Sequence, residues 1–342
     1  MKFTGNCLTT AMGILPHDNI GDAFKIAFSV DIPFWPQLPR FSFYEDMYVQ
    51  VCENFPGINI DEQELRVSLT TESFYDELMD YVAKSESEEV FKLSSKYSAT
   101  LSRFLQEDFS DYKYIRGQSI GPISFGLKIT DENRKPIIYN DDIRVFLYEF
   151  IAQKVNAQYR QLKELHDKPF VWVDEPGLEI LFTSFVGYPD SKAKEDFRVF
   201  LDRLEGPRGV HLCGNPDWSF LLSGLDLDIL SMDIFGNGEI FVRYTDEINA
   251  FLRRGGILSW GIVPTLTEEI DEETVTTLAD MLDNFWHYLD KRGIDLDLIL
   301  SQAWLAPARC CLVNLDGTAS VDRAFTLLND VAGVIKERYG LK

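Results

Sequence analysis

Four side chains of the kinds that bind soft metal ions stand at the ends of β-rich segments in this sequence. His211 and Cys213 are two positions apart in the run Gly-Val-His-Leu-Cys-Gly-Asn at 209–215. Because residues i and i+2 of a strand point the same way, both side chains face one side. Asp233 ends a second such run and Cys310 follows a third. Two sulfurs, an imidazole and a carboxylate suit zinc, so we predict a Zn²⁺ site made by His211, Cys213, Asp233 and Cys310.

Each of these residues also has a plain structural explanation. A His-X-Cys pair on a strand often serves packing alone, and Asp233 could cap the segment that follows it. Cys310 could be a buried neighbour of Cys311, and adjacent cysteines rarely both bind one ion, which leaves Cys311 as the spare. Only the shared position at strand ends favours a metal site.

The elements that must position these residues alternate between short β-rich runs and longer helical patterns from about residue 110. This alternation predicts a parallel sheet, and nearly continuous apolar runs are typical of strands that are covered on both faces. At 342 residues the chain fits a single (β/α)8 TIM barrel with N-terminal helical elaborations, and we expect one domain over 1–342. The expected strands are Tyr114–Ser119, Phe170–Asp174, Gly209–Cys213, Ile229–Asp233, Ile257–Trp260 and Leu300–Leu305, with an opening strand at Asn6–Met12.

Apolar residues at steps of three and four predict the helices. The expected helices run from Asp141 to Leu162, Val275 to Leu289, Ser320 to Ile335, Ala23 to Phe28, Ser73 to Ala83 and Glu88 to Leu105. The segment from Ile32 to Arg40 carries prolines and must hold or precede the second strand.

Further residues at strand ends are candidates for substrate binding, because barrel active sites lie at the carboxyl ends of the strands. Asp174 ends a strand within Asp174-Glu175-Pro176, where its carboxylate could hold a substrate amine, take a proton or only order the loop. Gly121 would let a ligand approach the backbone closely. His17 follows the opening strand and could reach the mouth, and Trp260 could be pocket wall or core.

Composition excludes several function classes. The net charge of −22, from 55 acidic against 33 basic residues, would repel nucleic acid and anionic membranes. The five cysteines are too sparse for a disulfide framework, and no apolar stretch is long enough to span a membrane. We expect a soluble cytoplasmic protein.

The chain resembles the superfamily shared by cobalamin-independent methionine synthases, methylcobalamin:coenzyme M methyltransferases and uroporphyrinogen decarboxylases. Gly13-Ile14-Leu15-Pro16 is similar to the Gly-Ser-Phe-Pro turn that opens the methionine synthase barrel, and Gly121-Pro122 matches a Gly-Pro turn. Asp174-Glu175-Pro176 matches an Asp-Glu-Pro whose aspartate binds the amino acid substrate. His211-Leu212-Cys213 matches the His-X-Cys zinc pair, and Cys310-Cys311-Leu312 matches a Cys-Gly-Leu that supplies the last zinc cysteine, which selects Cys310.

This resemblance implies a zinc-dependent methyltransferase acting on a thiol such as homocysteine or coenzyme M. It also implies a methyl donor, carried on a corrinoid protein or, second, methylfolate; the charge of −22 disfavours a polyanionic folate tail. The chain departs from the family at Ile14, which replaces a serine, and at Asp233, where the family has glutamate. The glutamate of the second strand that helps bind the amino acid has no visible counterpart.

Two other functions stay open at this point. One is a uroporphyrinogen decarboxylase-like enzyme with Asp174 as an acid and the cysteines merely buried. The other is a non-catalytic protein that binds a corrinoid or another tetrapyrrole. The first predicts binding of a porphyrinogen or corrinoid ring without a metal, and the second predicts ligand binding without turnover of any thiol.

Overall fold

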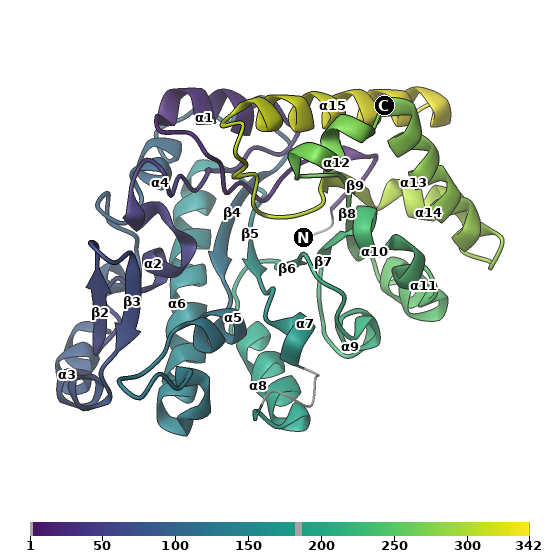
Figure 1. Cartoon of the computed structure of the whole chain (residues 1–342). Helices are drawn as coiled ribbons and strands as arrows, with labels where there is room; N and C mark the ends of the chain where they lie inside the picture. Colours follow the sequence, from purple (N-terminus) through teal and green to yellow (C-terminus); the bar gives the residue numbers. More distant parts are fainter. Residues whose placement is uncertain (1–2, 182–186, 342) are drawn as a thin grey trace.

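The computed structural model describes residues 3–181 and 187–341. Seven strands of this part form one parallel sheet in the order β1-β9-β8-β7-β6-β5-β4. Figure 1 shows this sheet curling, with helices along its outer side. The α/β class and the parallel sheet predicted from the sequence are confirmed. The strands of the sheet are β1 Leu8–Thr9, β4 Ile115–Ile120, β5 Pro169–Asp174, β6 Arg208–Leu212, β7 Ile229–Asp233, β8 Ile257–Val263 and β9 Ala303–Pro307.

The two edges of the sheet, β1 and β4, are joined by an irregular segment. The backbone N–H of Ile32 donates to the carbonyl of Thr9 at 2.9 Å, and Arg116 N–H donates to the carbonyl of Pro33 at 3.0 Å. Phe34 also forms a parallel bridge with Arg116. This segment lies where the second strand of a closed barrel would run, but within the described residues it forms no regular strand.

Helices cover the sheet after each strand. The long helix α6 begins at Asp141, as the sequence predicts, and Asn140 is its N-cap, because the Asn140 side chain accepts from the N–H groups of Asp142 and Ile143. None of the helices within 3–181 and 187–341 is long and apolar enough to cross a membrane. After β1 and β4 to β9 in turn, the helices are α1 Ile20–Ala27; α5 Pro122–Lys128 and α6 Asp141–Leu165; α7 Leu178–Leu181 and α8 Asp190–Asp202; α9 Trp218–Ser223; α10 Ile234–Phe241 and α11 Thr245–Arg253; α12 Thr267–Glu272, α13 Val275–Asp290 and α14 Leu296–Ser301; and α15 Ala319–Tyr339.

The region before β4 differs most from the sequence prediction. The helix predicted from Glu88 to Leu105 is wrong as one element, because a short 3-10 turn at Glu88–Val90 is followed by irregular chain and by a separate helix, α4, at Ala99–Phe104. Ser98 starts α4 by accepting from the N–H of Leu101. This region also holds α2 Met47–Val51, the antiparallel hairpin of β2 Ile58–Asp61 and β3 Arg66–Leu69, and α3 Thr71–Lys84.

The inside of the curled sheet is filled in layers. The rings of Phe3, Phe170 and Trp304 contact one another near the amino ends of the strands, with centroids 5.3 to 5.5 Å apart. Above them, the fully buried guanidinium of Arg116 lies 4.3 Å from the Trp172 ring centroid. The layer at the carboxyl ends is polar, and it contains the predicted metal ligands.

Candidate metal centre

Four ligand atoms converge at the carboxyl ends of β5 and β6 and in the loop after β9. One ligand atom each of Asp174, His211, Cys213 and Cys310 lies within 4.8 Å of the other three. His211 Nε2 is 3.3 Å from Cys213 Sγ, which is 3.5 Å from Cys310 Sγ. Ligand atoms around one tetrahedral zinc, bound at about 2.0 to 2.3 Å, would lie roughly 3.3 to 3.8 Å apart. The separations that involve Cys213 therefore suit a single tetrahedral ion.

Strand register brings Asp174 and His211 together. The two residues are direct partners in the parallel pairing of β5 with β6. Since side chains alternate across a strand, Trp172 and Asp174 face the interior with His211 and Cys213. The N–H of Glu175 donates to the carbonyl of His211 at 2.8 Å, which extends the pairing to the point where Cys213 leaves the strand.

Cys310 is held by the turn that opens the chain. The N–H of Ile14 donates to the carbonyl of Cys310 at 3.0 Å, and the N–H of Leu312 donates to the carbonyl of Ile14 at 3.0 Å. The other side of this turn pairs with Gln37, whose N–H donates to the carbonyl of Gly13. The Gly13-Ile14-Leu15 motif therefore positions the last cysteine.

A neighbouring hydroxyl fixes the orientation of the His211 ring. His211 Nδ1 is hydrogen-bonded to Ser231 Oγ at 2.9 Å, and the ring stacks on Trp172 at an interplanar angle of 27°. With Nδ1 donating to Ser231, Nε2 keeps its lone pair toward the cysteines, as a metal-binding histidine requires.

The charges of the cluster are strongly coupled. The hydrogen bond from Cys310 and the proximity of His211 hold the pKa of Cys213 well below its usual range, although burial opposes this. The same hydrogen bond and burial raise the pKa of Cys310. Burial alone would lower the pKa of His211, but the Cys213 thiolate raises it overall. A thiolate at Cys213 is therefore favoured, and thiolates are the form that binds metals.

Asp174 has an oxygen that is free for a ligand. Burial raises the pKa of its carboxyl to about 7, and the charge of Cys213 raises it further while His211 lowers it. Its Oδ1 atom is buried and accepts no hydrogen bond from the described residues. Since buried polar atoms are nearly always paired, this atom points to a missing cation, proton donor or substrate group.

Asp233, which the sequence offered as the carboxylate ligand, is outside this group. One of its oxygens accepts from Gly236 N–H at 2.7 Å as the cap of α10, and the other accepts from Arg309 Nε at 3.4 Å. Asp233 therefore caps α10, which is the structural role that the sequence analysis gave as its alternative. The carboxylate that lies within the cluster is that of Asp174.

The other predicted substrate contacts lie elsewhere. A side chain at Gly121 would place its Cβ 2.1 Å from Glu175 Oε1, so the glycine makes room for that carboxylate. Trp260 is core, because it faces the helices and meets Phe241 of α10 and Trp286 of α13 edge to face. His17 is buried near acidic residues of the α1 and α15 side, including Asp322, and burial lowers its pKa.

Two buried ionisable residues near the cluster, Glu175 and Arg116, were not singled out from the sequence. The Glu175 carboxylate accepts from the N–H groups of Ile123 and Ser124 at 3.0 and 2.8 Å, at the start of α5, and burial raises its pKa to about 8. Arg116 donates to Gln118 Oε1 and to backbone carbonyls, and Asp174 is the acidic residue whose charge favours its protonated form. For Arg116, the signal was the pair of long polar residues, Arg116 and Gln118, in a short run that could be a barrel strand.

Comparison with known proteins places the fold. No protein-family model matches the chain, and a search of curated proteins found no match. The structure is similar to a B12-independent methionine synthase from Shewanella sp. W3-18-1 solved in complex with selenomethionine, with 14% identity, a TM-score of 0.57, and coverage of 97% of this chain and 98% of that one. The chain shares this fold. A methyltransferase from Methanosarcina mazei is similar at 12% identity and a TM-score of 0.55, over 97% of this chain and 94% of that one. Both likenesses agree with the superfamily that the sequence motifs resemble.

Proposed function

We propose that this chain is a zinc-dependent methyltransferase that activates a substrate thiol. The observation that carries the proposal is the convergence of the His211, Cys213 and Cys310 ligand atoms with Asp174 inside one 4.8 Å cluster. Two sulfurs and an imidazole nitrogen favour zinc over magnesium or calcium, which prefer oxygen ligands.

The residues of the cluster have separate tasks in this proposal. His211, Cys213 and Cys310 would hold the ion, with the His211 ring oriented by Ser231. A zinc ion bound there would favour the deprotonated form of a substrate thiol, which at a pKa of about 8.5 is otherwise only a few per cent thiolate at pH 7. Asp174 would orient the acceptor, because its Oδ1 is buried and free to accept a hydrogen bond.

The transfer itself needs no redox chemistry. The substrate sulfur forms a bond to the methyl carbon while the bond from that carbon to the donor breaks, and the bonding pair leaves with the donor. The buried setting of His211 and Asp174 keeps competing water away from this displacement. Homocysteine and coenzyme M are the acceptors that the resemblance suggests, and the selenomethionine bound to the Shewanella protein makes homocysteine the first to test.

The test is methyl transfer from methylcobalamin or methyltetrahydrofolate to homocysteine or coenzyme M, with the methylated thiol measured by mass spectrometry. We expect transfer by the wild type, its loss in Cys213→Ser, and its retention in Cys311→Ser, which changes the exposed neighbour of Cys310. Transfer that survives both Cys213→Ser and removal of the metal would refute the proposal. Absence of transfer together with tight binding of a tetrapyrrole would favour the decarboxylase-like or non-catalytic alternatives.

A further inference from the structure

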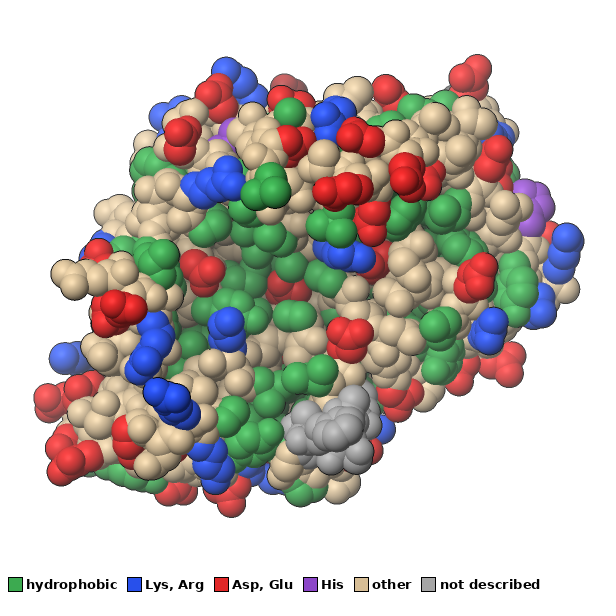
Figure 2. Space-filling view, viewed as in Figure 1, with side chains coloured by type: hydrophobic (Ala, Val, Ile, Leu, Met, Phe, Trp, Pro, Cys, Tyr) green, Lys and Arg blue, Asp and Glu red, His purple; other side chains and the backbone are tan. Residues whose placement is uncertain are grey.

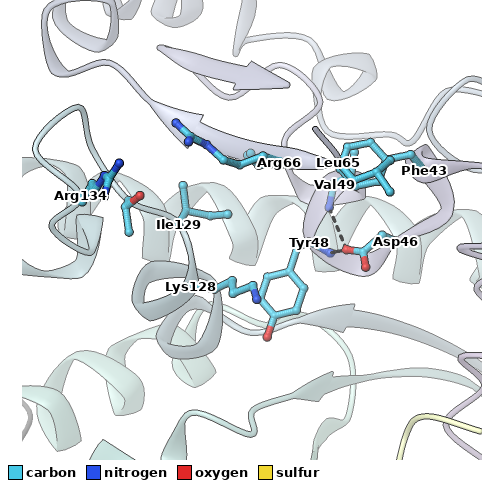
Figure 3. Close-up of a pocket in the computed structure, with 11 residues that line it drawn as sticks. Phe43, Asp46, Tyr48, Val49, Leu65, Arg66, Lys128, Ile129 and Arg134 are labelled. Carbon is cyan, nitrogen blue, oxygen red and sulfur yellow. Dashed lines mark hydrogen bonds between the residues drawn. The ribbon is translucent and has the colours of Figure 1, made fainter. Parts of the chain in front are cut away.

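A pocket of about 590 Å³ lies between the β2–β3 hairpin, α2 and the end of α5. Its volume is within the usual range for small-molecule sites. Strand β3, on one side of the pocket, is held to the segment after α5, on another side, because Leu69 N–H donates to the carbonyl of Thr130 at 2.9 Å. Figure 3 shows the residues that line it, which are Phe43, Asp46, Tyr48, Val49, Leu65, Arg66, Val67, Lys128, Ile129, Thr130 and Arg134.

Three basic side chains of this pocket lack acidic partners. Arg66, Lys128 and Arg134 are exposed, and within the described part of the chain no carboxylate is paired with any of them at 4.0 Å or less. Figure 2 shows Lys and Arg side chains gathered over the region of β2, β3 and α5. Three cationic side chains around one cavity, none of them within 4.0 Å of a carboxylate in the described part of the chain, are free to donate to an oxyanion.

Two acidic residues near the pocket, Asp46 and Asp61, accept hydrogen bonds from backbone N–H groups. The Asp46 carboxylate, which lines the pocket, accepts from the N–H of Tyr48 at 2.8 Å as the cap of α2. Asp61, opposite Arg66 in the hairpin, accepts from the N–H groups of Gln63 and Glu64 at 3.0 Å. Neither carboxylate neutralises the three cations by direct pairing.

Tyr48 connects this pocket to the cluster. Its side chain lines the pocket, and the charges of Asp174 and Cys310 act on its hydroxyl together with burial. Tyr48 is therefore the residue of the pocket lining that lies within electrostatic reach of Asp174 and Cys310.

We propose that this pocket binds a carboxylate or phosphate group of the methyl donor, and that the methyl-bearing part of the donor passes Tyr48 to reach the cluster. The inference rests on the proposed function for the identity of the ligand as methyl donor. Arginine and lysine are the side chains that recognise these oxyanions. Both donor classes named above satisfy this chemistry, since methyltetrahydrofolate carries glutamate carboxylates and methylcobalamin carries one phosphodiester.

The test is calorimetric titration of the zinc-loaded protein with methyltetrahydrofolate and, separately, with methylcobalamin. The pocket variant is Arg66→Gln/Arg134→Gln. The matched control, Arg243→Gln/Lys291→Gln, removes the same charge from exposed residues outside the pocket. We expect at least one donor to bind, with a Kd raised about tenfold or more in the pocket variant, within twofold of wild type in the control, and raised by added salt. The donor that shows this pattern identifies the source of the oxyanion.

Binding of neither donor, or equal weakening in the pocket and control variants, would overturn the inference. Titration needs no turnover, so this outcome is distinct from failure of the proposed function. A protein that binds a donor through these arginines but methylates no thiol would refute the methyltransferase proposal and leave the oxyanion site standing.

Discussion

Replacing Ser231 by alanine should weaken zinc binding without touching a ligand. Ser231 Oγ is 2.9 Å from His211 Nδ1 and is buried on β7, facing the same interior as the cluster. Without this partner, the ring loses the contact that selects its tautomer, and Nδ1 is left buried without that hydrogen bond. Loss of such a supporting hydrogen bond typically costs 10- to 100-fold in metal affinity, or about 1.4 to 2.7 kcal/mol.

Ser259 provides a matched control for this substitution. It is the register partner of Ser231 on β8, it is equally buried, and its hydroxyl has no hydrogen-bond partner among the described residues. Ser259→Ala should therefore leave zinc affinity unchanged. Ser231→Ala should lower the free energy of unfolding of the metal-free protein by only about 1 kcal/mol, the net contribution of one neutral hydrogen bond.

The assay is competition for zinc against a chromophoric chelator at pH 7.5, with urea unfolding of the metal-free proteins beside it. An affinity of Ser231→Ala within twofold of wild type would contradict the account of the His211 orientation. So would an equal loss in Ser259→Ala.

Three further predictions concern charge and packing away from the ligands. Burial lowers the pKa of Lys154 to about 8, so between pH 8 and about 10.4 the unfolded chain binds more protons than the folded one, and stability rises with pH through that window. Lys154→Met should therefore raise the free energy of unfolding by about 2 to 3 kcal/mol at pH 7. This gain should shrink toward zero near pH 11. A gain in urea titrations that does not depend on pH would exclude this cause. Gly121→Ala should destabilise the protein by about 1 to 3 kcal/mol, because its Cβ would lie 2.1 Å from a Glu175 carboxylate oxygen. A thermal midpoint equal to that of wild type would show that the carboxylate moves aside freely. Gly333 lies in the exposed middle of α15, with no heavy atom within 4 Å of an added Cβ, so Gly333→Ala should stabilise the protein by about 0.5 to 1 kcal/mol. A lower thermal midpoint in the same scan would show that this helix face is not open to an added methyl group.

The strands that carry the site could be predicted because they are covered on both faces. Their runs of β-branched and aromatic residues are distinct from the stepped patterns of helices, and Ile229–Asp233 was predicted to the residue. The last strand was predicted three residues early at its start, because Leu296–Ser301 is apolar enough to resemble a strand but forms α14 under the Asp295 cap. Short apolar runs do not separate these two states.

The members of the side-chain cluster were predicted only in part, since sequence cannot measure distances between strands. Asp174 and Asp233 are both acidic residues at strand ends, and nothing in the sequence tells which one reaches Cys213. Trp260 could have been placed by parity, because Ser259 is the register partner of Ser231 and the adjacent tryptophan must then face the helices.

The basic pocket was missed because it depends on the β2–β3 hairpin, which was not predicted. The alternation in Ile58–Asp61 and Arg66–Leu69 is short and only half-buried, so its signal is weak. The net charge of −22 argued against an anionic donor, but a net charge says nothing about a local group such as Arg66, Lys128 and Arg134. Local charge decides binding at contact distance, because salt at about 0.1 M screens surface charges that lie more than roughly 10 Å away.

Elemental analysis of zinc in protein purified without added metal tests the central claim most directly. The comparison is wild type with Cys213→Ala and Cys310→Ala, and with Cys311→Ala and Cys52→Ala as controls that change cysteines outside the cluster. The account predicts about one zinc per chain in the wild type and both controls, and its loss in Cys213→Ala and Cys310→Ala. Wild-type protein without zinc after reduction and reconstitution, or zinc retained in both cluster variants, would contradict it.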